Sequence, residues 1–310
     1  MATLKLLLLK TAILRSISYF DIFNHPLRKE EIMNLCNVKG RHDVFEDALG
    51  RLIKEEKCFE ENGYYSLQKD FTQSIELRKE KEKRAQGYFA KLPFYANIIK
   101  SFPFVKALAI SGSLSKNVMH EDGDIDYFVI TSAGRLWICR TLLILFKKIF
   151  LLNSRKYFCV NYFIDENNLE IADENIFTAI ELAYLIPVYN PGLIQKMKDK
   201  NQWTGTYFSN FEHFITVDVV ENKTSFKKWV ERLFQNSLAD RIDLFFMKLT
   251  YKRWKGKFPH FSSSKFELTM RTNRGVSKHH PQDFQNKVLK EFQSRMKDLN
   301  IVEETKKIIV

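Results

Sequence analysis

The sequence predicts a mixed α/β protein of the α+β type, in which a helical N-terminal module precedes a central mixed sheet with helices and a basic helical C-terminal region. Three apolar runs of strand length, at 105–110, 125–131 and 157–164, predict the sheet, and a helix-length run at 134–152 separates the last two. Helically spaced apolar residues predict the N-terminal helices. The 310 residues are 45% hydrophobic and 28% charged, which excludes a disordered or collagen-like chain.

Residues 1–70 form the first predicted domain, with three helices followed by a hairpin. The helices are predicted at 6–23, 27–35 and 41–53, and the hairpin strands at 57–60 and 64–67. Asn62-Gly63 between these strands is a strong signal for a tight turn. This order of elements resembles a winged helix-turn-helix module, which implies DNA binding.

The charge of the helix that would enter DNA favours another role. Between residues 41 and 56 this helix carries three basic residues and five acidic ones: Arg41, Arg51 and Lys54 against Asp43, Glu46, Asp47, Glu55 and Glu56. A net negative surface repels phosphates. The charge sign therefore favours a protein-contact or scaffold role, with DNA binding as the weaker alternative.

Residues 71–104 are predicted to form a connecting helix. The run from 76 to 84 mixes acidic and basic side chains, which is typical of a solvated helix face. Two further domains follow, at 105–220 for the sheet and at 221–310 for the basic region.

Neither of the two longest apolar runs predicts a membrane span. Two basic residues soon follow the run at 4–9, and three basic residues interrupt the run at 136–152. The four cysteines form no CxxC pair and predict neither a disulfide framework nor a zinc site. We therefore expect a soluble cytoplasmic protein with no membrane partner.

The stretch 105–131 carries the chemistry. A strand runs into Gly112-Ser113, and after ten intervening residues Asp124 and Asp126 open a second strand. Because side chains alternate along a strand, the two carboxylates project to the same face. Paired carboxylates hold Mg²⁺ together with substrate phosphates. A glycine lets the backbone approach an anion, and the serine hydroxyl and nearby N–H groups can bind phosphates.

This spacing resembles the signature of the DNA polymerase beta-type nucleotidyltransferase superfamily, closely over 105–131 and loosely in element order to about residue 190. The resemblance implies a nucleotidyltransferase sheet in which Gly112 and Ser113 bind the triphosphate of an NTP. It also implies that Asp124 and Asp126 hold Mg²⁺ or Mn²⁺. The implied reaction is in-line transfer of an NMP to a hydroxyl, with release of pyrophosphate.

Two basic residues near the motif are candidate phosphate ligands. Lys116 lies three residues after Ser113, within reach of a phosphate, although an exposed loop lysine fits the same spacing. Arg135 lies beside a turn at 132–134, where the next helix can present its N-terminus to an anion. Arg140, further along that helix, is expected to pair with a carboxylate.

The position of a third carboxylate is decisive for catalysis. Enzymes of this superfamily usually place one on a later strand, and the corresponding strand at 157–164 carries Asn161 instead. An asparagine can offer its carbonyl to a metal ion but cannot act as a base at neutral pH. Asp165 and Glu170 are alternative donors if the strand bends.

Three histidines are further candidates. His120 lies between the Gly-Ser turn and the acidic pair, either near the substrate or in a flexible loop. His279 and His280, followed by Pro281, predict a turn that leads into a helix, since adjacent histidines cannot easily chelate one ion.

Nearly all of the net charge of +12 lies near the C-terminus, where residues 223–310 contain 20 Lys and Arg against 9 Asp and Glu. Between 248 and 278, nine basic residues face one acid, Glu267, and are interleaved with five aromatic residues: Tyr251, Trp254, Phe258, Phe261 and Phe266. Such a segment either binds RNA or another polyanion, with the rings stacking on bases, or forms a solvated basic face whose aromatic residues pack inward.

The sequence thus favours a Mg²⁺-dependent nucleotidyltransferase that moves an NMP from an NTP to a hydroxyl of RNA, a protein or a small molecule. Asparagine at position 161 supports the alternative, a catalytically impaired regulator that binds nucleotide or nucleic acid.

Overall fold

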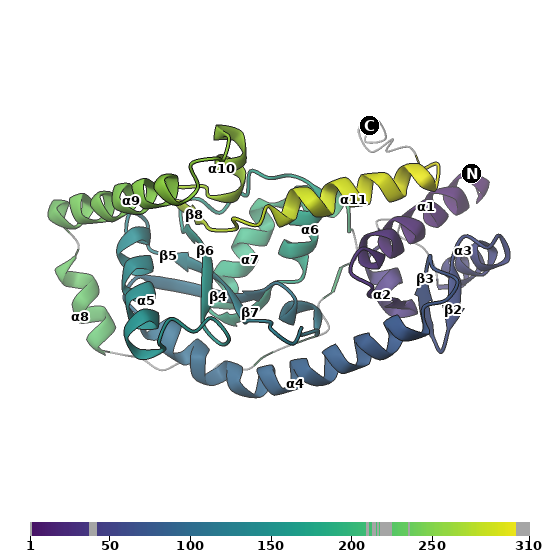
Figure 1. The fold of residues 1–310 in the computed structure, drawn as a ribbon, viewed down its shortest axis with the longest axis horizontal. Helices are drawn as coiled ribbons and strands as arrows, with labels where there is room; N and C mark the ends of the chain where they lie inside the picture. Colours follow the sequence, from purple (N-terminus) through teal and green to yellow (C-terminus); the bar gives the residue numbers. More distant parts are fainter. Residues whose placement is uncertain are drawn as a thin grey trace.

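A mixed α/β fold is confirmed by the computed structural model, which describes residues 2–36, 42–208, 211, 212, 215, 217, 225–234 and 236–301 (Figure 1). A sheet with helices on both faces lies at the centre, and a smaller helical module with a short sheet lies at the N-terminal end of the molecule. A long helix runs along one edge and joins the two.

The central sheet has five strands in the order β7-β4-β5-β6-β8. Its three inner strands are those that the sequence predicts: β4 (Val105–Ser111), β5 (Asp126–Thr131) and β6 (Cys159–Asp165). β5 runs antiparallel to β4 and parallel to β6. The ends of β4 and the starts of β5 and β6 therefore meet at one edge of the sheet, which is where the Gly-Ser turn and the acidic pair lie.

Both outer strands differ from the sequence prediction. β7 (Ile186–Tyr189), within a stretch expected to be helix-rich, pairs antiparallel with β4. It contains Pro187, a residue that sheets tolerate at their edges. β8 (Val276–Lys278) comes from the C-terminal region expected to be helical and pairs antiparallel with β6. The basic region therefore contributes a strand to the central sheet.

Each face of the sheet is covered by helices. α4 (Thr72–Ser101) and α5 (Leu136–Phe150) share one apolar cluster with β4 and β5, in which Trp137 is fully buried. α7 (Pro191–Lys200) and the end of α6 (Ile176–Ala183) pack on the opposite face. A short 3-10 helix (Gln202–Thr206) follows α7.

The N-terminal module contains the hairpin that the sequence predicts, with strands β2 (Phe59–Glu61) and β3 (Tyr64–Ser66). Its helices are α1 (Ala2–Asp21), α2 (Lys29–Asn34) and α3 (His42–Lys54). The second predicted helix begins too early, because β1 (Leu27–Arg28) pairs with β3. Arg41, which opens the third predicted helix, lies outside the described residues.

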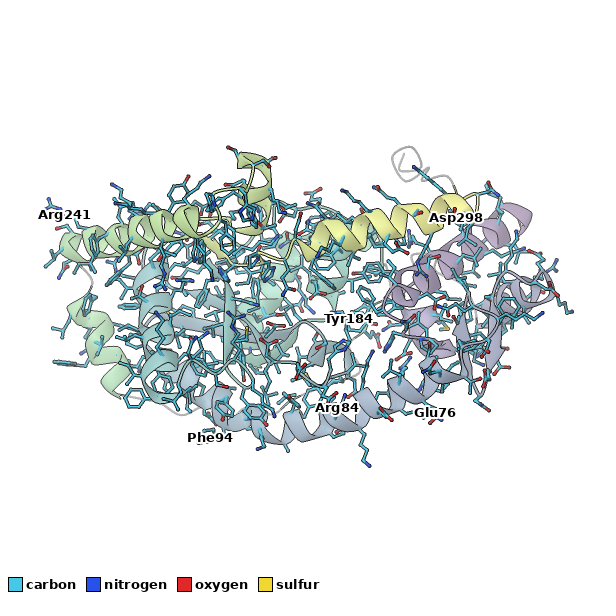
Figure 2. The ribbon with its side chains drawn as sticks, in the orientation of Figure 1. Glu76, Arg84, Phe94, Tyr184, Arg241 and Asp298 are labelled. Carbon is cyan, nitrogen blue, oxygen red and sulfur yellow. The ribbon has the colours of Figure 1, made fainter. Side chains whose placement is uncertain are left out.

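α4 is the long helix that the sequence predicts, and Glu76, Arg84 and Phe94 mark its course in Figure 2. The expectation of a wholly solvated charged face is wrong, because Arg78 and Lys81 are buried. The Arg78 guanidinium lies 2.6 Å from Glu31 of α2 and also donates to the carbonyl oxygen of Pro26. α4 thus fixes the N-terminal module to the rest of the chain through a buried ion pair.

The C-terminal region contains α8 (Ser225–Leu233), α9 (Ser237–Lys257), α10 (Ser263–Thr269) and α11 (Phe284–Asp298). α9 packs on α5, and α11 packs with α1 and α6 (Figure 1). None of the described helices is both long and apolar enough to cross a membrane.

Candidate functional site

A cavity of about 630 Å³ opens at the edge of the sheet where β4, β5 and β6 meet. Five residues that the sequence predicts for the site line it: Gly112, Ser113, Asp124, Asp126 and Asn161. His120 also lines the cavity, whereas Lys116 and Arg135 do not. The structure thus brings together the turn, the acidic pair and the asparagine.

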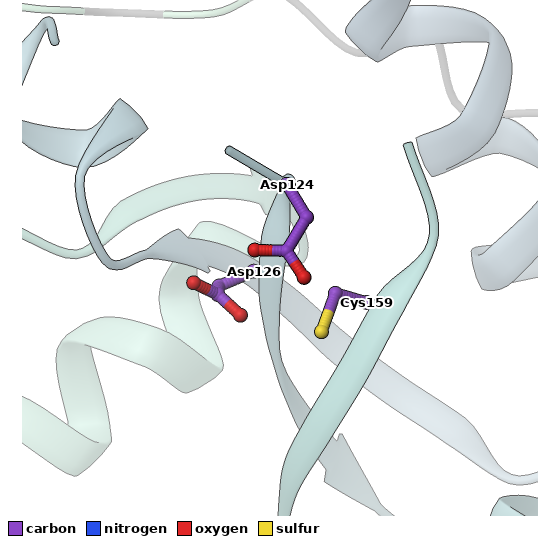
Figure 3. A group of neighbouring side chains, drawn as sticks. All are labelled: Asp124, Asp126 and Cys159. Atoms are coloured by element: carbon purple, nitrogen blue, oxygen red, sulfur yellow. The ribbon is translucent and has the colours of Figure 1, made fainter. Parts of the chain in front are cut away.

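Asp124 and Asp126 face the same side (Figure 3), although β5 begins only at Asp126 and Asp124 lies just before the strand. A carboxylate oxygen of each residue and the Sγ atom of Cys159 lie within 4.8 Å of one another. Burial, followed by the charges of the two aspartates, raises the pKa of the Cys159 thiol, so the sulfur remains protonated. The two carboxylates are oxygen donors of the kind that a hard cation such as Mg²⁺ or Mn²⁺ takes, whereas the sulfur of Cys159 is a soft donor that such a cation does not favour.

A hydrogen bond orients the Asp126 carboxylate, and its surroundings raise its pKa. Asn161 Nδ2 donates to Asp126 Oδ1 at 2.8 Å, so the asparagine orients one of the candidate metal ligands. Burial and, next, the charge of Asp124 raise the pKa of Asp126 to about 7. A bound cation would offset this cost, because it stabilises the ionised carboxylate.

Gly112 lies against the same carboxylate. Its φ of +67° is in the left-handed region, and a Cβ atom there would be 2.5 Å from Asp126 Oδ2. No larger residue therefore fits between the turn and the acidic pair, which explains a glycine at this position.

α4 anchors the loop between the turn and the acidic pair. The N–H of Met119 donates to the Lys81 carbonyl at 3.1 Å, and Arg84 donates to the Met119 carbonyl at 3.0 Å. The Tyr88 hydroxyl donates to the Gly123 carbonyl at 3.0 Å. These bonds fix the loop just before Asp124.

Glu181 on α6 is a cavity-lining carboxylate that the sequence analysis missed. It accepts a hydrogen bond from the Gly112 N–H at 3.3 Å and forms an ion pair with Lys116 Nζ at 2.9 Å. Its charge also contributes to the raised pKa of Asp126. The available signal was a single acid within an otherwise uncharged helix, IFTAIELA.

The two predicted phosphate ligands have protein partners. Lys116 is paired with Glu181 and also donates to the Gly112 carbonyl at 3.0 Å. Arg135 turns away from the cavity and pairs with Asp240 of α9 at 2.5 Å. In this structure Lys116 supports the Gly-Ser turn and Arg135 ties α5 to α9, so their phosphate-binding role stays a prediction that this geometry does not support.

The two alternative third carboxylates do not join the site. Asp165 lies at the far end of β6, opposite Thr131, and accepts hydrogen bonds from Asn167 and Asn168. Glu170 is exposed and does not line the cavity.

Five basic side chains line the cavity, and one of them, Lys278, is paired with Asp173 at 2.9 Å. We call the other four the cationic pole: Arg140, Lys147, Arg155 and Lys257. Within the described part of the chain, none of them forms an ion pair, so the expected carboxylate partner of Arg140 is absent there. The guanidinium of Arg140 instead lies 4.9 Å from the ring centroid of Trp254.

The two adjacent histidines lie in the turn that precedes α11, as predicted, and both line the cavity. Burial lowers the pKa of His279 to about 3 and that of His280 to about 4, so both are neutral at pH 7. His279 lies against the ring of Trp254, with 4.9 Å between ring centroids.

The aromatic residues of the basic segment mostly pack inward. Trp254 and Phe266 are buried in a small cluster, against which Phe258 and Phe261 pack. Tyr251 is exposed. This arrangement agrees with the solvated basic face for four of the five rings.

Comparisons of the chain with protein-family models, with curated proteins and with solved structures found no match.

Proposed function

We propose that the protein is a divalent-metal-dependent nucleotidyltransferase that transfers an NMP from an NTP to an acceptor hydroxyl. The observation that carries the proposal is the convergence of Gly112, Ser113, Asp124 and Asp126 on one cavity, although ten residues separate the two motifs. A structural Gly-Ser turn has no need of a paired-carboxylate neighbour in an open cavity.

The arrangement of elements supports the resemblance to the polymerase beta-type superfamily. The turn follows one strand, the acidic pair opens the antiparallel neighbour, and a parallel strand lies beside it. We assign the N-terminal helices and three-stranded sheet to a winged-helix-like module. On α3, Arg51 is paired with Asp47, and Glu46 is paired with Lys29, which supports a contact role over DNA binding.

The residues of the cavity have separate tasks in this reaction. Asp124 and Asp126 would hold Mg²⁺ or Mn²⁺, which neutralises phosphate charge when bound. The Gly112 N–H and the Ser113 hydroxyl would bind the terminal phosphates. The acceptor oxygen attacks the α-phosphorus, the bond to the β-phosphate oxygen breaks, and pyrophosphate leaves.

Asn161 cannot take the proton of the acceptor hydroxyl, because an amide is not a base at neutral pH. Glu181 lines the cavity on the side of the Gly-Ser turn, and a phosphate that binds the Gly112 N–H would release it from this donor. In-line attack comes from the side opposite the leaving pyrophosphate, so the acceptor proton would pass to solvent rather than to Glu181.

The test is transfer of label from each of four α-labelled NTPs, with Mg²⁺ or Mn²⁺, into the RNA, protein and small-molecule fractions of a cell extract. The double variant Asp124→Asn/Asp126→Asn should lose the label. Asp122→Asn is the matched control, because Asp122 is exposed in the same loop and does not line the cavity. Label that persists in the double variant would contradict the proposal.

A second candidate function is a nucleotide-binding regulator without catalysis. Asn161 favours it, since the residue occupies the strand next to Asp126 without offering a charge to a metal ion. Nucleotide binding that depends on Asp124 and Asp126, with no transfer from any NTP, would support this alternative.

A further inference from the structure

The cationic pole is unusual because its charges lack acidic partners among the described residues. Lys147 is buried, and burial is the main cause that lowers its pKa. Buried lysines in proteins are almost always paired, because an isolated charge is costly to desolvate. The guanidinium of Arg140 lies 5.7 Å and 4.9 Å from the ring centroids of Trp137 and Trp254, and the residue lines the cavity. The cost of keeping these charges indicates an anionic ligand.

The position of the cationic pole relative to the acidic pair indicates whether the anionic ligand belongs to the NTP or to the acceptor. In the sheet, β5 lies between β4 and β6. The Gly-Ser turn follows β4, whereas Arg155 precedes β6, and Lys147 of α5 lies close enough to Asp124 for that charge to raise its pKa. The acidic pair at the start of β5 therefore separates the turn from the cationic pole.

In-line displacement puts the attacking group and the leaving pyrophosphate on opposite sides of the α-phosphorus. If the pyrophosphate end of the NTP lies on the Gly-Ser turn, the acceptor enters from the side of β6. That side carries the unpaired cations.

We infer, on the basis of the proposed function, that the acceptor is a phosphorylated molecule and that the cationic pole binds its phosphate. Phosphate groups are the anions that multiple Lys and Arg side chains bind best, through charge-assisted hydrogen bonds. The substrate class narrows accordingly from any hydroxyl to a hydroxyl on a phosphate-bearing acceptor. The phosphates of the NTP itself are the rival source of the same chemistry.

The experiment compares two probes on the full chain by calorimetry. One is inorganic pyrophosphate without divalent metal: in the absence of the cation that would hold phosphates on the acidic pair, its charged ligands in the cavity are the unpaired side chains of the cationic pole. The other is α,β-methylene ATP with Mg²⁺, which reports on the donor side. Arg155→Ala/Lys257→Ala removes two exposed cations of the pole and leaves the buried members in position. Lys148→Ala/Lys252→Ala removes one exposed cation from α5 and one from α9, neither of which lines the cavity, and is the matched control.

We expect Arg155→Ala/Lys257→Ala to weaken pyrophosphate binding by about 10- to 100-fold, as expected for the loss of charged hydrogen bonds, and to change the affinity for α,β-methylene ATP less than about threefold. The control should match the wild type for both probes. Parallel weakening of both probes would overturn the inference, since the pole would then bind the donor. Unchanged pyrophosphate binding would overturn it as well.

Failure of the proposed function has a different signature. Absence of transfer from any NTP, with pyrophosphate binding still dependent on the cationic pole, would refute the transferase and the acceptor assignment but retain an anion site. Loss of pyrophosphate binding in Arg155→Ala/Lys257→Ala, with intact transfer by that variant to an acceptor that carries no phosphate, would refute the acceptor assignment alone.

Discussion

Replacement of Gly112 by alanine tests the central feature of the site, the close approach of the turn to the acidic pair. An alanine Cβ would lie 2.5 Å from Asp126 Oδ2 and 3.3 Å from Asp126 Cβ and Cγ. To restore a normal contact of about 3.5 Å, the carboxylate oxygen must retreat by about 1 Å. Metal ligands tolerate displacements of only about 0.2 Å, so the pair would no longer bind a cation well.

The expected cost in stability has two parts. A φ of +67° costs alanine about 1 to 2 kcal/mol, and overpacking against the carboxylate adds about 1 to 3 kcal/mol. We therefore expect Gly112→Ala to lower the free energy of unfolding by about 2 to 5 kcal/mol in urea titrations, and to weaken Mn²⁺ binding at least tenfold by calorimetry.

Gly63→Ala is the matched control, because this glycine in the hairpin turn has a φ of +79° and no atom within 4 Å of an added Cβ. It should lose only the backbone part, about 1 to 2 kcal/mol, and bind Mn²⁺ like the wild type. Equal destabilisation by the two substitutions, with Mn²⁺ affinity retained in Gly112→Ala, would refute the geometry of the site.

Three further changes test other parts of the structure. Asn161→Asp replaces the hydrogen-bond donor to Asp126 with a third carboxylate. We expect the free energy of unfolding without metal to fall by about 1 to 3 kcal/mol and Mn²⁺ to bind more tightly. Weaker Mn²⁺ binding by calorimetry would contradict this expectation. Asp243→Ala removes the acceptor for two backbone N–H groups at the start of α5, so the free energy of unfolding should fall by about 2 to 4 kcal/mol in urea, whereas Asp243→Asn, which keeps one acceptor oxygen, should lose less. Burial raises the pKa of Asp21 from 3.8 to about 6, so its folded form binds the proton more tightly; this stabilisation is complete below about pH 4 and is lost as the pH rises through 6, by about 3 kcal/mol. Urea titrations between pH 4 and 7.5 should show the wild type losing this amount relative to Asp21→Asn, and a constant difference would argue against the assignment.

Local pattern was sufficient for the inner part of the fold. β4, β5 and β6 are apolar runs buried on both faces, and the hairpin has an Asn-Gly turn. Each of these elements can therefore be predicted from a few consecutive residues. The edge strands have no such signal. β8 has only three residues, and β7 contains a proline, so both are strands because they pair with β6 and β4.

The same division holds for the site. The motif predicts Gly112, Ser113, Asp124 and Asp126 together because their spacing along two adjacent strands fixes their relation. Lys116 and Arg135 lie near the motif in sequence, but each is paired with an acidic residue of a helix, 65 and 105 residues away respectively. Glu181 and the cationic pole were not assigned to the site from the sequence, because they reach the cavity from elements that are distant from the motif along the chain.

The sequence by itself determined the fold class, the inner strands and the pairing of a Gly-Ser turn with two carboxylates, because these depend on the period of side chains along a strand and on short-range spacing. Only the tertiary structure decided which charges are neutralised and which face the cavity. A charged side chain pairs with whatever the packing of helices brings within about 4 Å, and that distance is set by α4, α5, α6 and α9 lying against one sheet, not by the order of residues along the chain.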